Sequence, residues 1–128
     1  DTTIQPFASI MAYKARPLNG IWATAPYLHN GSVPTLYDLL LPKRQANDPL
    51  EGEYRPDEFM VGSREFDPEK VGFKSTDYEG FLFRTHIWGN YNAGHEYASG
   101  RTSQPDGTLL PALTKEQRLD LLEYLKSL

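Results

Sequence analysis

Residues 16–36 read Arg-Pro-Leu-Asn-Gly-Ile-Trp-Ala-Thr-Ala-Pro-Tyr-Leu-His-Asn-Gly-Ser-Val-Pro-Thr-Leu, and this stretch, the first motif, decides the fold. A short helix is predicted at its end, over residues 35–41. Ser32 or Thr35 can cap the first turn of that helix, and Pro34 lies near that turn, where proline is tolerated. Pro42 ends the helix, because proline cannot continue it.

A second helix is predicted over residues 114–128. Thr114 is a good N-cap residue, and Gln117 three positions later completes a capping box, the pattern that marks a helix start. Leucines recur at helical spacing behind this cap and predict one apolar side that packs on the core. These leucines are Leu119, Leu121, Leu122, Leu125 and Leu128.

The middle of the chain, residues 43–75, is rich in proline, glycine and charge and is predicted as a long irregular excursion. Residues 58–61 read as a strand that pairs with residues 80–84, which include the apolar run Phe-Leu-Phe. The predicted fold is therefore mainly α, with long irregular loops and one small β-hairpin. Long loops are unusual in a self-standing domain, so we expect this segment to wrap a cofactor or another domain.

Composition limits the function classes. The chain has 128 residues, which predicts a single domain over residues 1–128. Its net charge of −4 argues against a nucleic-acid partner. Its apolar runs are too short to predict a membrane span. The chain has no cysteine, so it forms no disulfide and holds no Cys-x-x-Cys-His segment for covalent haem attachment.

The second motif, residues 89–97, reads Gly-Asn-Tyr-Asn-Ala-Gly-His-Glu-Tyr. Asn90 and Asn92 suit tight turns, and Gly94 permits a close backbone approach or a positive φ. Such a turn would present His95 at its tip. An imidazole in that position is well placed to reach the iron of a flat macrocycle as an axial ligand.

Together the two motifs resemble the C-terminal haem domain of di-haem c-type cytochromes, the group that contains the bacterial cytochrome c peroxidases and the rubber-oxygenase-like cytochromes. The resemblance extends over residues 11–128 and is most specific in the two motifs. It implies a partial cytochrome c-like domain whose haem c is attached outside this chain. In the rubber-oxygenase-like branch a Gly-His-Glu-Tyr segment supplies the distal axial histidine, which implies that His95 binds haem iron. A methionine fills that role in the peroxidase branch, and this chain has none after Met60.

Two further residues are candidates for haem contact. Trp22 can pack its face against the macrocycle or donate from Nε1 to a propionate, although a core position is the alternative for Trp22 and for Trp88. Arg16 can pair with a propionate. With His95 as distal ligand, the haem would be six-coordinate and of lower potential than one with axial methionine, and suited to electron transfer.

The resemblance also implies a calcium ion at the boundary between the two haem domains. In the peroxidases the motif Thr-Ala-Pro-Tyr-x-His-(Asp/Asn)-Gly gives that ion the carbonyls that correspond to Thr24 and Pro26, ligands that suit a hard cation. A packed turn is the alternative for this segment. His29 is expected to form a hydrogen bond near the haem edge or the domain interface, and His86 is expected to be structural or at the surface.

The function expected from these observations is that of the C-terminal part of a di-haem cytochrome oxidoreductase, peroxidase- or oxygenase-like, in the periplasm or secreted. This part would supply the distal ligand and the pocket wall for electron transfer and hold no catalytic residue itself. Its partners would be the N-terminal haem-bearing part, or a second chain, and an electron-transfer protein. The alternative is a haem-less module on the same scaffold that binds a ligand or a protein. A hydrolase has no nucleophile constellation behind it.

Overall fold

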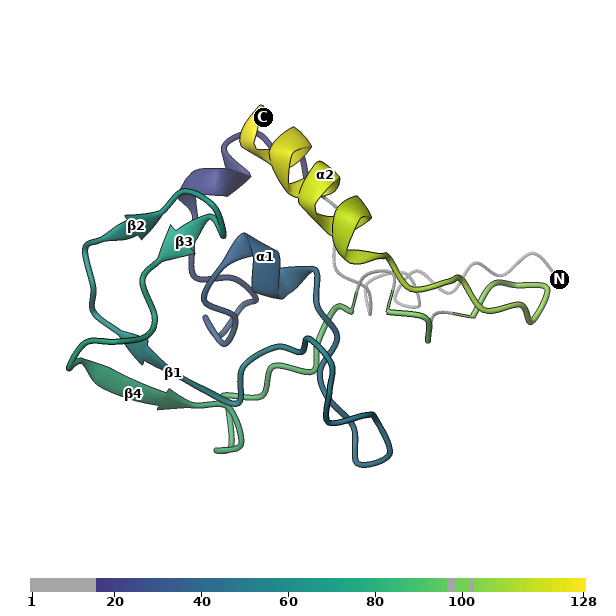
Figure 1. Cartoon of the computed structure of the whole chain (residues 1–128), viewed down its shortest axis with the longest axis horizontal. Coiled ribbons are helices and arrows are strands. Elements are labelled where there is room, and N and C mark those ends of the chain that lie inside the picture. Colours follow the sequence, from purple (N-terminus) through teal and green to yellow (C-terminus); the bar gives the residue numbers. More distant parts are fainter. Residues whose placement is uncertain (1–15, 97–98, 102) are drawn as a thin grey trace, which may run out of the picture.

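The computed structural model describes residues 16–96, 99–101 and 103–128 (Figure 1). The described residues form a short 3₁₀ helix, two α-helices and four strands. In chain order these are η2 (Ile21–Ala23), α1 (Leu36–Leu39), β1 (Glu58–Val61), β2 (Phe66–Asp67), β3 (Gly72–Phe73), β4 (Phe81–Arg84) and α2 (Lys115–Lys126).

The prediction of a mainly α fold is wrong. The two α-helices contain 4 and 12 residues, and the strands form two separate two-stranded antiparallel sheets. Among the described residues, only the two stretches with a predicted N-cap are α-helical. Elsewhere proline and glycine interrupt the chain too often for a helix to extend, so loops carry most of the described residues.

The structure confirms the capped C-terminal helix. In α2 the Gln117 amide donates to Thr114 Oγ1 at 3.2 Å and the Thr114 amide donates to Gln117 Oε1 at 3.0 Å, which is the predicted capping box. Leu122 and Leu125 are buried, whereas Leu119 is 43% exposed. The buried side of the helix is therefore narrower than the predicted stripe, and Leu119 lies outside it.

The structure selects Thr35 rather than Ser32 as the cap of α1, because the Asp38 amide donates to Thr35 Oγ1 at 3.1 Å. The start of this helix is held by β3. The Leu36 amide donates to the carbonyl of Val71 at 2.8 Å, and a β-bridge joins Thr35 to Gly72. This short helix is therefore fixed by a strand contact as well as by its own hydrogen bonds.

The predicted pairing of residues 58–61 with residues 80–84 is confirmed. Strands β1 and β4 pair antiparallel, with Glu58 opposite Arg84 and Val61 opposite Phe81. The segment between them holds β2 and β3, which the sequence did not predict and which pair at Phe66–Phe73 and Asp67–Gly72. Strands of two residues are too short to give a periodic pattern that could be recognised in the sequence.

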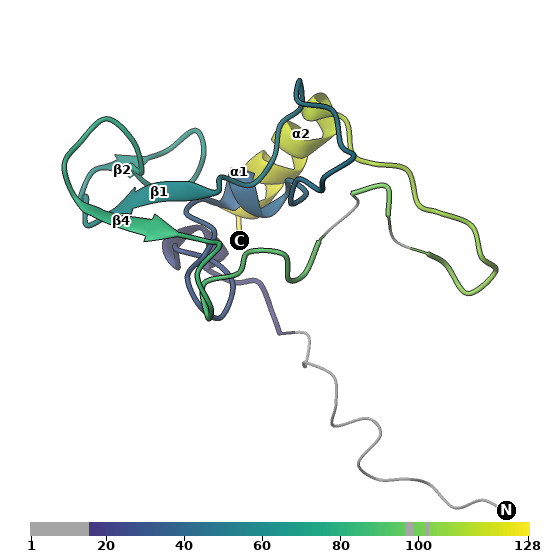
Figure 2. The same cartoon turned by 90° about the horizontal axis from the view of Figure 1, so that it is seen from below.

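The core lies between the first motif, α1 and α2. Figure 1 shows α2 beside α1 with the strands to one side, and Figure 2 shows the same arrangement from below. Within the described residues, neither α-helix has the length and apolarity required to cross a membrane. The buried members of the core cluster are Tyr27, Val33, Leu36, Tyr37, Leu41, Val71, Leu122 and Leu125.

Candidate functional site

The two sequence motifs lie side by side in the structure. Asn30 Nδ2 donates to the carbonyls of Gly89 and Tyr91, at 3.0 and 2.8 Å. Ser32 Oγ also donates to the carbonyl of Tyr91, at 3.1 Å. The Asn30 side chain is held in turn by the amide of Ser32, which donates to its Oδ1 at 3.2 Å. The first motif therefore fixes the beginning of the second.

The histidines of the two motifs face one another. The ring centroids of His29 and His95 are 6.0 Å apart, with the ring planes inclined at 41°. Both residues are exposed. His95 has φ 51°, in the left-handed region that a non-glycine residue seldom occupies. Gly94, for which a close backbone approach or a positive φ was considered, has no positive φ. The unusual backbone belongs to His95 itself.

A buried arginine lies behind this loop. Arg55 is 2% exposed. Its Nη1 donates to the carbonyls of Asn92 and Gly94 at 2.8 and 2.7 Å, and its Nη2 donates to the carbonyls of Leu39 and His95, both at 2.9 Å. No pattern in the sequence marked Arg55, because this residue lies in the irregular middle segment and outside both motifs.

Residues 89–96, the His95 loop, have further anchors at their centre and end. Asn92 is buried, and its Nδ2 donates to the carbonyl of Pro56 at 2.9 Å. The carboxylate of Glu96 accepts from the Lys43 amide at 2.7 Å and from Arg101 Nη1 at 3.2 Å. The loop has no regular secondary structure, so side chains from distant segments satisfy its backbone groups.

The candidate haem-contact residues and the second tryptophan all lie at the surface. Trp22, on η2, is 44% exposed, and Arg16 is exposed. Trp88 is 87% exposed and packs edge-on against Tyr91 with ring centroids 6.0 Å apart. Core positions for Trp22 and Trp88 are thereby ruled out. His86 is exposed, which agrees with its interpretation as a structural or surface residue.

The segment expected to hold calcium forms a turn. The Thr24 amide and its Oγ1 both donate to the carbonyl of Ile21, at 3.3 and 3.0 Å. Within the described residues, the carbonyls of Thr24 and Pro26 accept no hydrogen bond. Both residues are exposed. Two carbonyls are fewer than the six to eight oxygen ligands that calcium takes, so further ligands would have to come from elsewhere.

The described side chains do not form a complete metal-ion site of their own. In these parts of the chain no three His, Cys, Asp or Glu side chains gather closely enough to hold an ion. The structure instead offers one pair of imidazoles at the surface, His29 and His95. Such a pair is suited to a metal that brings its remaining ligands with it.

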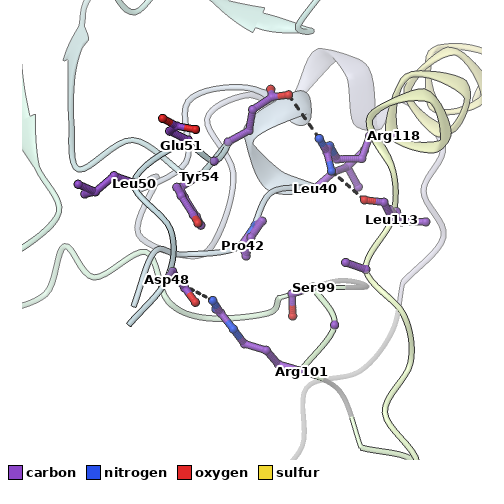
Figure 3. Close-up of a pocket in the computed structure, with 14 residues that line it drawn as sticks. Leu40, Pro42, Asp48, Leu50, Glu51, Tyr54, Ser99, Arg101, Leu113 and Arg118 are labelled. Atoms are coloured by element: carbon purple, nitrogen blue, oxygen red, sulfur yellow. Dashed lines mark hydrogen bonds and ion pairs between the residues drawn. The ribbon is translucent and has the colours of Figure 1, made fainter. Parts of the chain in front are cut away.

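One cavity of the described residues has no histidine in its lining. It has a volume of about 790 Å³ and opens between residues 48–54, the segment around Arg101 and the start of α2 (Figure 3). Four of its charged side chains already form pairs: Arg101 contacts Asp48, and Arg118 lies 3.5 Å from Glu53. A hydrogen bond from Tyr37, followed by the nearby charges of Lys115 and Arg118, lowers the pKa of Glu53 despite the opposing effect of desolvation. These pairs make the cavity wall a structural network.

The comparisons with known proteins agree with the first motif. The profile of the family described as RoxA-like, cytochrome c-like matches residues 12–47. Over 119 residues the chain is 49% identical to Uncharacterized protein y4iJ of Sinorhizobium fredii (strain NBRC 101917 / NGR234). This matched region is 92% of this chain and 18% of the relative. Over 71 residues the chain is 42% identical to Uncharacterized protein y4iM of the same strain, covering 56% of this chain and 14% of the relative.

The chain therefore spans less than a fifth of the length of these curated relatives. The profile match ends before β1 and does not reach the His95 loop. The matched residues contain the whole first motif and α1. Residues 12–47 are a cytochrome c-like region.

Proposed function

We propose that this chain is the C-terminal part of a di-haem c-type cytochrome and that His95 supplies the distal axial ligand of one haem iron. The observation that carries the proposal is the position of His95: exposed, on a loop that the cytochrome c-like region holds through Asn30 and Ser32. The resemblance of the second motif to the rubber-oxygenase-like branch supports the same assignment.

The residues present fit a haem that is attached elsewhere. A neutral imidazole is a common axial ligand, and a macrocycle supplies four of the other ligands of its iron. Because the chain has no cysteine, the covalent attachment of that haem would lie outside it. When bound, the haem supplies one-electron redox chemistry. His95 would bind and orient it, while the exposed faces of Trp22, Trp88 and Tyr91 would help to exclude water.

The whole protein is proposed to be a periplasmic or secreted oxidoreductase. Its N-terminal haem-bearing part, or a second chain, would cover the exposed histidine and aromatic side chains, and a further protein would exchange electrons with it. The lengths of the relatives leave room for such a part. Arg16 is proposed to pair with a propionate, which agrees with its exposure.

A calcium ion is proposed at the boundary with that N-terminal part. The carbonyls of Thr24 and Pro26 would be two of its ligands, and the rest would come from the partner or from water. What supports this is that neither carbonyl accepts a hydrogen bond from the described residues.

The experiment that tests the ligand assignment compares three variants of the whole haem-loaded protein: His95→Ala, His29→Ala and His86→Ala. Optical and electron paramagnetic resonance spectra report the spin state of each haem. His95→Ala should convert one haem from low-spin six-coordinate to high-spin five-coordinate, while His86→Ala should leave both spectra unchanged. His29→Ala identifies which member of the histidine pair reaches the iron.

Conversion in His29→Ala but not in His95→Ala would transfer the ligand role to His29. A low-spin spectrum in all three variants would overturn the ligand proposal. A whole protein without a Soret band would favour the alternative, a haem-less module that binds a ligand or a protein.

A further inference from the structure

We infer that Arg55 is the positioning residue of the His95 ligand: its buried guanidinium fixes the backbone on both sides of His95 and thereby the direction of the imidazole. The inference rests on the proposed function and adds to it a residue that neither motif contains.

The geometry of the contact is specific to His95. The carbonyl of Gly94 belongs to the peptide group before the His95 Cα, and the carbonyl of His95 belongs to the peptide group after it. Arg55 Nη1 binds the first at 2.7 Å and Nη2 binds the second at 2.9 Å. Because one planar guanidinium holds both peptide groups, it restricts the φ and ψ angles between them and so the Cα–Cβ direction of His95.

The conformation that is held is one that the chain would otherwise leave. His95 has φ 51°, and the left-handed region is unfavourable for a residue with a Cβ. A strained backbone persists only where its surroundings over-determine it. Arg55, which is buried, supplies that restraint. Asn30 and Ser32 hold the start of the same loop.

The arginine is itself anchored, so that it does not simply follow the loop. Its Nη2 also donates to the carbonyl of Leu39 at the end of α1, and its own amide donates to the carbonyl of Pro42 at 3.0 Å. Desolvation raises the pKa of Asp38 on the same helix, and the Thr35 hydrogen bond, then the charges of Lys70 and Arg55, oppose that rise. Arg55 thus connects the His95 loop to α1, and α1 is packed in the core.

The test uses Arg55→Lys and Arg55→Met in the whole haem-loaded protein, with Arg118→Met as the matched control. Arg118 is a half-buried arginine whose Nη1 also donates to a carbonyl, that of Leu113, but it lies at α2. Arg55→Met keeps the length of the side chain and removes every donor. Arg55→Lys keeps the charge but replaces the planar fork with a single ammonium that cannot hold both peptide groups in the same way.

The expected result is a loss of the low-spin signal of one haem in Arg55→Met, a smaller loss in Arg55→Lys, and no change in Arg118→Met. Added imidazole should restore the low-spin signal in Arg55→Met, because the iron remains available while the native ligand is misdirected. Amide hydrogen exchange across residues 92–96 should be roughly tenfold faster or more in Arg55→Met, since charge-assisted hydrogen bonds to that backbone are lost.

Wild-type spectra together with wild-type exchange in Arg55→Met would overturn the inference. If that variant does not fold, the same pair of results in Arg55→Lys would overturn it. The proposed function has its own test: an unchanged spectrum in His95→Ala would show that His95 is not the ligand. A spectrum that changes in His95→Ala but in neither Arg55 variant would leave the ligand assignment in place and remove Arg55 from it.

Discussion

Asn30 donates from Nδ2 to the carbonyl of Tyr91 at 2.8 Å and so joins the two motifs directly. Among the described residues, the backbone hydrogen bonds outside helices and strands include none between residues 24–36 and the His95 loop. Side chains alone make this junction. An amide side chain with one acceptor and two donors can bind its own turn and the neighbouring loop at the same time, as Asn30 does.

Replacing Asn30 with alanine should therefore loosen the site. The variant loses the bonds to Gly89 and Tyr91 and the bond from Ser32. Because Asn30 is exposed, water compensates in part, and the free energy of unfolding should fall by about 1–2 kcal/mol. Urea unfolding of the 128-residue chain measures this. Asn47→Ala, at an exposed residue, should change the midpoint little, and equal effects of both variants would contradict the junction.

Gly72 should not tolerate a side chain. A Cβ placed there would lie 2.6 Å from the carbonyl oxygen of Pro34 and 2.9 Å from Thr35 Cα. Both are backbone atoms at the start of α1, so they cannot turn away, and Gly72→Ala should destabilise the chain by about 1–3 kcal/mol. Gly94→Ala is the control, because a Cβ there meets nothing within 4 Å. A thermal melt of Gly72→Ala that matches wild type would show that β3 is not pressed against α1.

The two leucines that the sequence placed in one stripe should differ sharply. Leu122 is buried in the core cluster, and truncation to alanine should lower the free energy of unfolding by about 2–5 kcal/mol. Leu119 on the same helix is 43% exposed, and its truncation should stay within about 0.5 kcal/mol. Chemical denaturation of both variants makes the comparison. Similar losses would mean that α2 is rotated about its axis relative to the position described.

Local signals in the sequence accounted for part of this fold. The capping box of α2 and the pairing of β1 with β4 were predicted, and Thr35, one of two predicted caps, is the N-cap of α1. These features depend on residues close in sequence or on a clear apolar run. The predicted end of α1 was wrong, because the helix ends at Leu39, before Pro42 is reached. The predicted balance of helix and loop was also wrong. Two helices with good signals do not make a mainly α fold when the segments between them are held by long-range hydrogen bonds, which leave no periodic pattern.

The site shows the same division. Both motifs were recognised in the sequence, and the structure places them together. Arg55 was missed because nothing near it in sequence marks a buried arginine, and arginine is ordinarily expected at the surface. A positive φ was one of two roles considered for Gly94, and in the structure it belongs to His95. A restraint from a distant side chain can hold a conformation that propensity alone assigns to glycine.

The last prediction concerns pH. Tyr27 is buried in the first motif, and its hydroxyl donates to the carbonyl of Ile21 at 2.7 Å. Burial raises the pKa of Tyr27 from 10.0 to about 12, although the Thr24 side chain opposes this. The folded state thus holds the phenol proton more tightly than the unfolded state. This contribution to stability is fully present below pH 10 and is lost as the pH rises through about 12.

The free energy of unfolding should therefore fall across that window, with Tyr27 contributing up to about 3 kcal/mol of the fall. Tyr27→Phe has no proton to lose, so its stability should decline less steeply. Part of the decline should remain, because burial and then Glu53 also raise the pKa of Tyr37. Urea midpoints measured from pH 8 to pH 12 give both slopes. Tyr124→Phe, at an exposed tyrosine, should follow the wild-type curve. Parallel curves for Tyr27→Phe and wild type would place the titration in another group.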